Sequence, residues 1–153
     1  MRFTVDTNVL VYASDTGSPE KRRIAREIMA RAMTLDAVLT AQALAEFLNV
    51  VRRKNPAGFS AARAQAERWA TVFPVASTNW EQVSKAAELA ERHRLQFWDC
   101  LIWQSARALQ TAVFLSEDMQ DGFSMDGMTV LNPFAGANAK RLADLLEKAD
   151  DSV

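Results

Sequence analysis

Cysteine and histidine are almost absent from this chain of 153 residues, in which each occurs once, as Cys100 and His93. One cysteine cannot form an intrachain disulfide or build a cysteine-based zinc site. A serine–histidine triad is poorly supported, because His93 lies in a polar run and no G-x-S-x-G motif exists. Neither GxGxxG after the first predicted strand nor GxxxxGK[ST] is present, which argues against a Rossmann cofactor site and a P-loop enzyme.

Long apolar runs and an excess of one charge are missing as well. No stretch approaches the roughly 18 apolar residues of a membrane span, and the start of the chain reaches a charge too early for a signal peptide. We therefore expect a soluble, cytoplasmic protein that contacts no membrane. The chain has 18 basic and 19 acidic residues and a formal net charge of -1. Because proteins that coat nucleic acid are usually basic, any contact with nucleic acid must be local.

Short apolar segments alternate with amphipathic ones along the chain. Strands are predicted at residues 3–5, 37–39, 72–75, 112–115 and 129–131. Pro74 favours an edge position for the third. Helices are predicted from Pro19, at 40–55, 60–71, 78–92, from about 98 and at 138–149. This alternation predicts a single three-layer α/β/α domain over residues 1–153, with a parallel sheet of four or five strands.

Capping signals set the expected helix starts. Ser18 precedes a proline suited to the first helical position, and Thr40 is expected to cap the next helix. Thr78 and Glu81 have the spacing of a capping box, in which each residue satisfies a free backbone N–H of the other. Thr7 or Asn8 is expected to cap a short helical turn after the first strand.

Acidic residues stand where ligands bind in parallel sheets, beyond the carboxyl ends of the strands. Asp6 directly follows the first predicted strand, and Asp118 comes just after the strand at 112–115. Asp99 opens a helix and borders its apolar face. Each acid also has a structural interpretation: Asp6 as a turn cap, Asp99 as an acid favoured by the helix dipole, and Asp118 as part of a polar loop.

Glu46 is the least distinctive acid by pattern. On a helical wheel it shares a face with Gln42, Asn49 and Arg53, away from the apolar face around Leu48. Pattern alone therefore predicts a glutamate that faces solvent.

Four segments taken together resemble the successive acidic motifs of the PIN-domain family, and in particular its VapC-type toxin ribonucleases. They are VDTNVLVYA at 5–13, AEF at 45–47, FWDCLI at 97–102 and LSEDMQDG at 115–122, in matching order and spacing. NPF at 132–134 resembles a common ending in one bacterial branch. The similarity covers essentially the whole chain. It implies that the catalytic, metal-binding acids are Asp6, Glu46, Asp99 and Asp118, and that supporting polar groups are Thr7, Asn8, Ser116 and Asp121.

The last of these motifs leaves one assignment open. Glu117 and Asp121 stand beside Asp118, so more than one acid is available to complete the site. Four clustered carboxylates repel one another, and a hard divalent cation relieves that repulsion. Mg²⁺ or Mn²⁺ suits oxygen ligands better than zinc does.

The resemblance implies an activity and partners that composition and periodicity do not give. It implies a metal-dependent endoribonuclease that hydrolyses RNA phosphodiester bonds as the toxin of a type II toxin–antitoxin pair. It also implies a cognate antitoxin that blocks the acidic pocket, and a homodimer.

Two groups of side chains are candidates for contact with an RNA strand. The basic residues are Lys21, Arg22, Arg23, Arg26, Arg52 and Arg53, which alternatively form solvated helix surfaces. The aromatic residues are Trp80, Trp98 and Trp103, which either stack on bases or belong to the core.

Two other functions remain open. A catalytically silent PIN-like module that binds RNA or protein would not need all four acids, and all four are present. A haloacid-dehalogenase-type phosphatase requires a second aspartate two residues after Asp6, where Asn8 stands, and a catalytic lysine for which no segment fits.

Overall fold

The computed structural model describes residues 1–14 and 17–147, and in these ranges it contains one six-stranded sheet in the order β3-β2-β1-β4-β6-β5. The strands are β1 (Phe3–Val5), β2 (Ala37–Thr40), β3 (Val75–Ala76), β4 (Val113–Leu115), β5 (Ser124–Met125) and β6 (Met128–Leu131). Every neighbouring pair is parallel except β5 and β6. The predicted α/β class is confirmed, and the prediction of four or five strands is one strand short.

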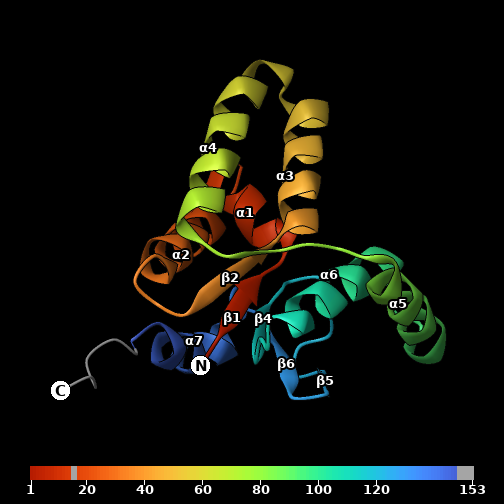
Figure 1. Ribbon diagram of the computed structural model, residues 1–153. Helices are drawn as coiled ribbons and strands as arrows, with labels where there is room; N and C mark the ends of the chain where they lie inside the picture. Colours follow the sequence, from red (N-terminus) through yellow and green to blue (C-terminus); the bar gives the residue numbers. More distant parts are fainter. Residues whose placement is uncertain (15–16, 148–153) are drawn as a thin grey trace.

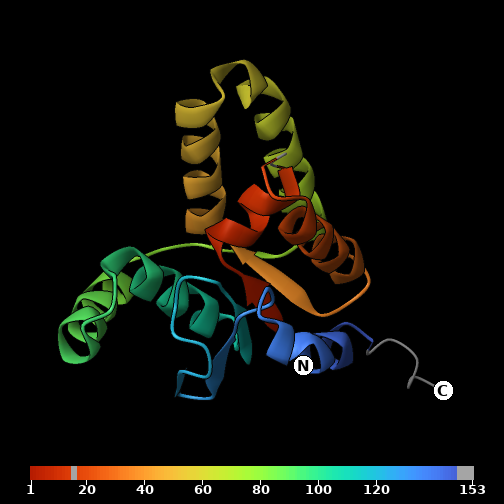
Figure 2. The same ribbon diagram turned by 180° about the vertical axis from the view of Figure 1, so that it is seen from behind.

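Helices cover both faces of this sheet. They are α1 (Thr7–Ser14), α2 (Pro19–Ala32), α3 (Ala41–Lys54), α4 (Phe59–Val72), α5 (Trp80–His93), α6 (Phe97–Ala108) and α7 (Ala139–Leu146). Short 3₁₀ turns, η1 (Pro56–Gly58) and η2 (Gly136–Asn138), precede α4 and α7. Figures 1 and 2 show α5 and α6 on one side of the sheet and α2 and α7 on the other.

The order of the strands places a natural binding position between β1 and β4. From β1 the chain moves outward to β2 and β3, and it then returns across the opposite face through α5 and α6 to β4. Ligands bind in open parallel sheets where the direction of strand addition reverses. Phe3, Val5, Phe114 and Leu115 are almost fully buried, so this part of the sheet is a rigid platform.

The hairpin of α3 and α4 extends beyond the end of the sheet where β2 stops (Figures 1 and 2). Thr40 caps α3, as predicted, because its Oγ1 accepts a hydrogen bond of 3.1 Å from the backbone N of Ala43. Phe47 is buried and packs against Trp69 of α4, with ring centroids 5.2 Å apart. The polar face of α3 is therefore free to line a cleft above the sheet.

The capping box predicted at Thr78 is wrong by one residue. The side chain of Asn79 accepts from the N of Gln82 at 3.0 Å, and the N of Asn79 donates to Gln82 Oε1 at 3.4 Å. The hydroxyl of Thr78 instead bonds to that of Ser105, at 3.2 Å. Thr7 also does not cap a turn, because it lies inside α1, and its N donates to Asp6 Oδ1.

Two strands and one helix differ from their predicted ranges. The third strand was predicted at 72–75, but residue 72 belongs to α4 and β3 begins at Val75. Its predicted edge position is confirmed. β5 was not predicted, since it has only two residues and neither is buried. The predicted last helix begins one residue later, at Ala139, and residues 148 and 149 of its predicted range lie outside the described part.

Within the described ranges, no helix has both the length and the apolar character needed to cross a bilayer.

Candidate functional site

Asp6 is a carboxylate held at the carboxyl end of the central strand. Its backbone N continues the sheet by donating to the O of Leu115 at 2.8 Å. The side chain is only 2% exposed, and it accepts hydrogen bonds from Thr7 N at 2.7 Å and Ser116 Oγ at 2.6 Å. Asn8 Nδ2 donates at 3.4 Å to Asp6 Oδ2, the oxygen that also accepts from Ser116. The side chain is therefore fixed by β1, α1 and the loop after β4.

Glu46 reaches the same place from α3. Thr7 Oγ1 donates to its Oε2 at 2.6 Å, and Gln42 Nε2 donates to its Oε1 at 3.1 Å. Gln42 Nε2 also donates to the backbone O of Trp98 at 3.0 Å, so one amide joins α3 to α6. The side chain is half-buried rather than solvent-facing, which corrects the prediction from the helical wheel.

The loop after β4 has three acids, and only one of them lines the acidic cleft. Asp118 Oδ2 accepts from Asn8 Nδ2 at 3.2 Å. Glu117 is paired with Lys21 at 2.7 Å. Asp121 accepts from the backbone N of Asn132 at 3.0 Å and from Asn138 Nδ2 at 2.9 Å, so it holds the base of the loop. The geometry therefore favours Asp118 as the acid that completes the site.

Ser116 links these groups. Its hydroxyl donates to Asp6 and accepts from the backbone N of Asp118 at 3.1 Å and of Met119 at 3.3 Å. One buried side chain thus fixes both the acid of β1 and the start of the loop that carries Asp118.

Asp99 differs from the other acids because none of the described residues donates a hydrogen bond to its carboxylate. Burial, together with the negative charges of Asp6, Asp118 and Glu46, raises its pKa to about 7. Burial likewise raises the pKa of Asp6 to about 6, against the opposing effect of the hydrogen bonds from Ser116 and Thr7. In the described part of the chain, no lysine or arginine forms an ion pair with any of these four acids. Their repulsion is therefore not relieved by a direct ion pair within the described residues.

The four acids line a single cleft of about 810 Å³. The other lining residues are Thr7, Asn8, Val11, Tyr12, Gln42, Ala45, Asn49, Val50, Arg53, Lys54, Gln96 and Trp98. Gln42 and Asn49 were not predicted as site residues, although they share the helical face of Glu46. Helical neighbours three and four positions apart project together, and that spacing was the available signal.

The predicted basic residues do not gather at this cleft. Arg53 is the only one of the six that lines it. Lys21 pairs with Glu117, and Arg23 pairs with Glu20 and Glu27 on the surface of α2. The remaining three lie elsewhere: Arg52 over the ring of Phe59, Arg26 bonded to the O of Ala13, and Arg22 half-buried on α2. Their contact with RNA stays a prediction.

A divalent cation fits this site by chemistry. The donors are all oxygens, the acids lack a counter-cation among the described residues, and Asn8 Oδ1 and Gln42 Oε1 are buried acceptors without a partner there. In the same part of the chain, no three acidic, histidine or cysteine side chains form a ready-made metal cage. Mg²⁺ does not require one, since it usually binds through one or two carboxylates and keeps several waters.

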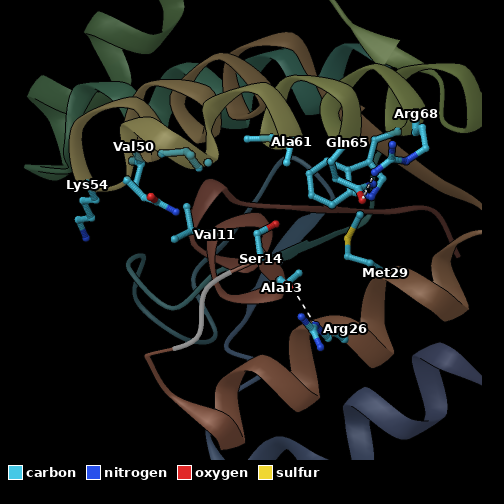
Figure 3. A pocket seen from close by; sticks show the side chains of 15 residues that line it. Val11, Ala13, Ser14, Arg26, Met29, Val50, Lys54, Ala61, Gln65 and Arg68 are labelled. Carbon is cyan, nitrogen blue, oxygen red and sulfur yellow. Dashed lines mark hydrogen bonds between the residues drawn. The ribbon is translucent and has the colours of Figure 1, made fainter.

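A second hollow, of about 560 Å³, adjoins the acidic cleft, because Val11, Val50 and Lys54 line both. Figure 3 shows side chains of α3 and α4, including Val50 and Gln65, opposite Arg26 and Met29 of α2. The dashed lines there mark the bond from Arg26 Nε to the O of Ala13, at 3.0 Å, and the bond between Arg68 and Gln65.

Solved structures with this fold include several toxins. The chain is similar to VapC20 of Mycobacterium tuberculosis, a toxin that cleaves the sarcin–ricin loop, with a TM-score of 0.62 and 21% identity over 73% of this chain and 86% of that chain. It is similar to VapBC2 of Rickettsia felis bound to promoter DNA, with a TM-score of 0.61 and 14% identity over 86% and 98%. A toxin–antitoxin complex from Klebsiella pneumoniae gives a TM-score of 0.60 and 15% identity over 85% and 96%. No curated protein sequence matches this chain.

The structure is an α/β domain whose acidic cleft lies at the switch point of its sheet. The PIN domain family model matches residues 3–123. The chain belongs to the PIN domain family, as the four sequence motifs predicted.

Proposed function

We propose that this protein is a metal-dependent endoribonuclease that hydrolyses phosphodiester bonds of RNA. The observation that carries the proposal is the convergence of Asp6, Glu46, Asp99 and Asp118 on one cleft, where none of them forms an ion pair with a described lysine or arginine. An acidic cluster of this kind repels a phosphate unless a divalent cation lies between them.

Each side chain has a proposed part in this reaction. Asp6, Glu46, Asp99 and Asp118 would hold Mg²⁺ or Mn²⁺, and a bound ion would supply an activated water and neutralise charge on the phosphoryl group. Thr7 and Ser116 donate to Glu46 and Asp6, which fixes the orientation of both carboxylates. Asn8 donates to Asp6 and Asp118 and so sets the spacing between β1 and the loop after β4.

Cleavage of single-stranded RNA by the purified full chain tests the proposal. Mn²⁺ or Mg²⁺ is supplied in one arm and EDTA in another, and Asp99→Asn is assayed in parallel. Asp144→Asn is a matched control, because Asp144 is an exposed aspartate paired with Lys140 on α7. We expect cleavage that requires metal, disappears in Asp99→Asn and persists in Asp144→Asn. Cleavage that survives EDTA or the Asp99 substitution would point to a contaminating nuclease.

We further propose that the protein is the cytoplasmic toxin of a type II toxin–antitoxin pair and forms a homodimer. Similar structures include toxin–antitoxin complexes, which supports an antitoxin partner. A partner segment lying in the second hollow would reach the acids past Val11 and Val50, which line both hollows. The protein encoded beside this chain should therefore stop cleavage when added in equal amount. Persistent cleavage would contradict this pairing.

The chemistry of the site disfavours the two other functions. A silent binding module has no need for four repelling acids. A haloacid-dehalogenase-type phosphatase, which would cleave small monoesters instead of internal diesters, needs a second aspartate where Asn8 stands. The same assay, with a small phosphate monoester as a second substrate, separates them, since a module cleaves neither substrate and a phosphatase cleaves only the monoester.

A further inference from the structure

An exposed tryptophan stands at the mouth of the acidic cleft. Trp98 is 55% exposed although it lies in the first turn of α6, and its neighbour Asp99 is one of the four acids. Among the described residues, the only other large aromatic side chain that is mostly exposed is Trp80, whereas Trp103 is fully enclosed by the core. Because a tryptophan left in water forgoes the gain of burial, its position beside the acids calls for an explanation.

Trp98 is held at its backbone and at its ring. Its backbone O accepts the 3.0 Å bond from Gln42, whose amide also binds Glu46. The ring of Phe97 meets the indole edge-on, with centroids 5.3 Å apart and an interplanar angle of 69°. The indole therefore sits at a fixed height relative to the acids and still offers much of its surface to the cleft.

Cations lie at the far end of the same cleft. Arg53 and Lys54 line it, and neither forms an ion pair with any described residue. Along α3 the cleft-lining residues run from Gln42 through Glu46 and Asn49 to Arg53. Eleven residues of helix separate the two ends, which corresponds to roughly 17 Å. The cleft thus presents an aromatic plate, then the acids, then two free cations.

We propose that this cleft binds a single strand with one unstacked base on Trp98 and its backbone directed along α3 to Arg53 and Lys54. This inference rests on the proposed nuclease function and adds the residues that would hold a base and the backbone of the strand. Aromatic plates combined with cations along a groove are how proteins hold single strands, because every base has a face that can stack. A continuous duplex keeps its base faces stacked within the helix, so it cannot use the plate.

Binding of a short fluorescein-labelled RNA strand, measured by anisotropy in EDTA so that cleavage does not interfere, tests the proposal. Loss of one stacking contact in Trp98→Ala should weaken binding by about 5- to 150-fold. Trp98→Phe should restore binding to within about threefold of the parent, because a phenyl ring still stacks. Trp80→Ala is the matched control, since Trp80 is 77% exposed on α5 and does not line the cleft. It should bind as the parent does.

The salt dependence of binding separates the plate from the cations. Arg53→Gln should reduce the slope of log affinity against log salt by about 0.7, the value for one contact to a single strand. Trp98→Ala should leave that slope unchanged, because stacking releases no counterions. A duplex of the same sequence should bind equally weakly to the parent and to Trp98→Ala.

Cleavage by the same proteins, measured separately with Mn²⁺ or Mg²⁺, distinguishes the failure of this inference from that of the proposed function. If the parent cleaves RNA and Trp98→Ala binds and cleaves equally well, the plate is refuted and the nuclease stands. If the parent binds in a Trp98-dependent way without cleaving, the plate stands and the nuclease fails. If Trp98→Ala changes only the oligomeric state in light scattering, the indole belongs to a protein interface and the proposal is overturned.

Discussion

Replacing Asp99 with asparagine should stabilise the protein in the absence of metal. Asp99 accepts no hydrogen bond from the described residues, so the amide keeps the shape of the side chain without breaking a contact. A rise in pKa from 3.8 to about 7 sets a ceiling of about 4 kcal/mol on the destabilisation by the charged form. Because the side chain is only half-buried, solvent screens much of this, and we expect about 1–2 kcal/mol.

The sign of the effect follows from the direction of the pKa change. An acid whose pKa is higher in the folded than in the unfolded state contributes stability at low pH. That contribution is lost as pH rises from about 3.8 through about 7. The advantage of Asp99→Asn over the parent should therefore be largest near pH 8 and should shrink as the pH is lowered towards 4.

Chemical denaturation in EDTA across this pH range measures the difference directly. At pH 8, a gain of about 1–2 kcal/mol corresponds to a melting temperature higher by about 2–8 °C for a chain of this size. A loss of stability at pH 8, or a gain that does not depend on pH, would refute the reasoning. Either result would mean that Asp99 has a stabilising contact and that repulsion in the cluster is weak.

Three further predictions concern the same region. Mn²⁺ at about 100 times its Kd should stabilise the parent by about 2.7 kcal/mol in thermal melts, and much less in Asp99→Asn; equal shifts would place the ion elsewhere. Asp121→Asn should destabilise the protein by about 1–2 kcal/mol in urea, because two hydrogen bonds hold its carboxylate and lower its pKa; unchanged stability would contradict this. Lys21→Met should slow RNA cleavage by freeing Glu117 beside Asp118, yet alter stability by less than about 1 kcal/mol; unaltered cleavage would show that the pair does not position the loop.

The central strands were predictable because both of their faces are buried. All residues of β1 and β2 are buried, and so are most residues of β4 and β6. These strands are short runs of mainly apolar side chains, and such runs identify strands covered by helices on both sides. β5 has no such signal, since neither residue is buried. The turn that joins β5 to β6 does have a sequence signal. Asp126-Gly127 is a favoured hairpin dipeptide, and both residues have positive φ, 51° and 83°.

The start of α5 shows why adjacent capping residues are hard to tell apart. Thr78 with Glu81 and Asn79 with Gln82 both have the spacing of a capping box, shifted by one residue. The hydroxyl of Thr78 bonds to Ser105 of α6, a residue 27 positions away. A contact so distant in sequence decides the cap, and local pattern does not contain it.

Glu46 was the hardest acid to predict for a related reason. The helical wheel correctly separated its face from the apolar face of α3, but a wheel does not say what a polar face meets. Here α3 extends beyond the end of β2, so its polar face looks across a cleft at Asp6 and Asp99 and not into open solvent. The resemblance to PIN domains placed Glu46 with the other acids, and no periodicity in this sequence does so.

The four acids are each easy to place locally but unfavourable as a group. Local rules place an aspartate after a strand or in the first turn of a helix at little cost, so each position is unremarkable by itself. In the cleft, burial raises the pKa of Asp6 and Asp99, the neighbouring carboxylates add to the rise, and both effects oppose folding with these acids charged. Residues that fit their local structure but together destabilise the folded protein are expected at sites that are selected for function and not for stability. The predicted gain in stability of Asp99→Asn therefore tests the assignment of this cleft as much as the cleavage assay does.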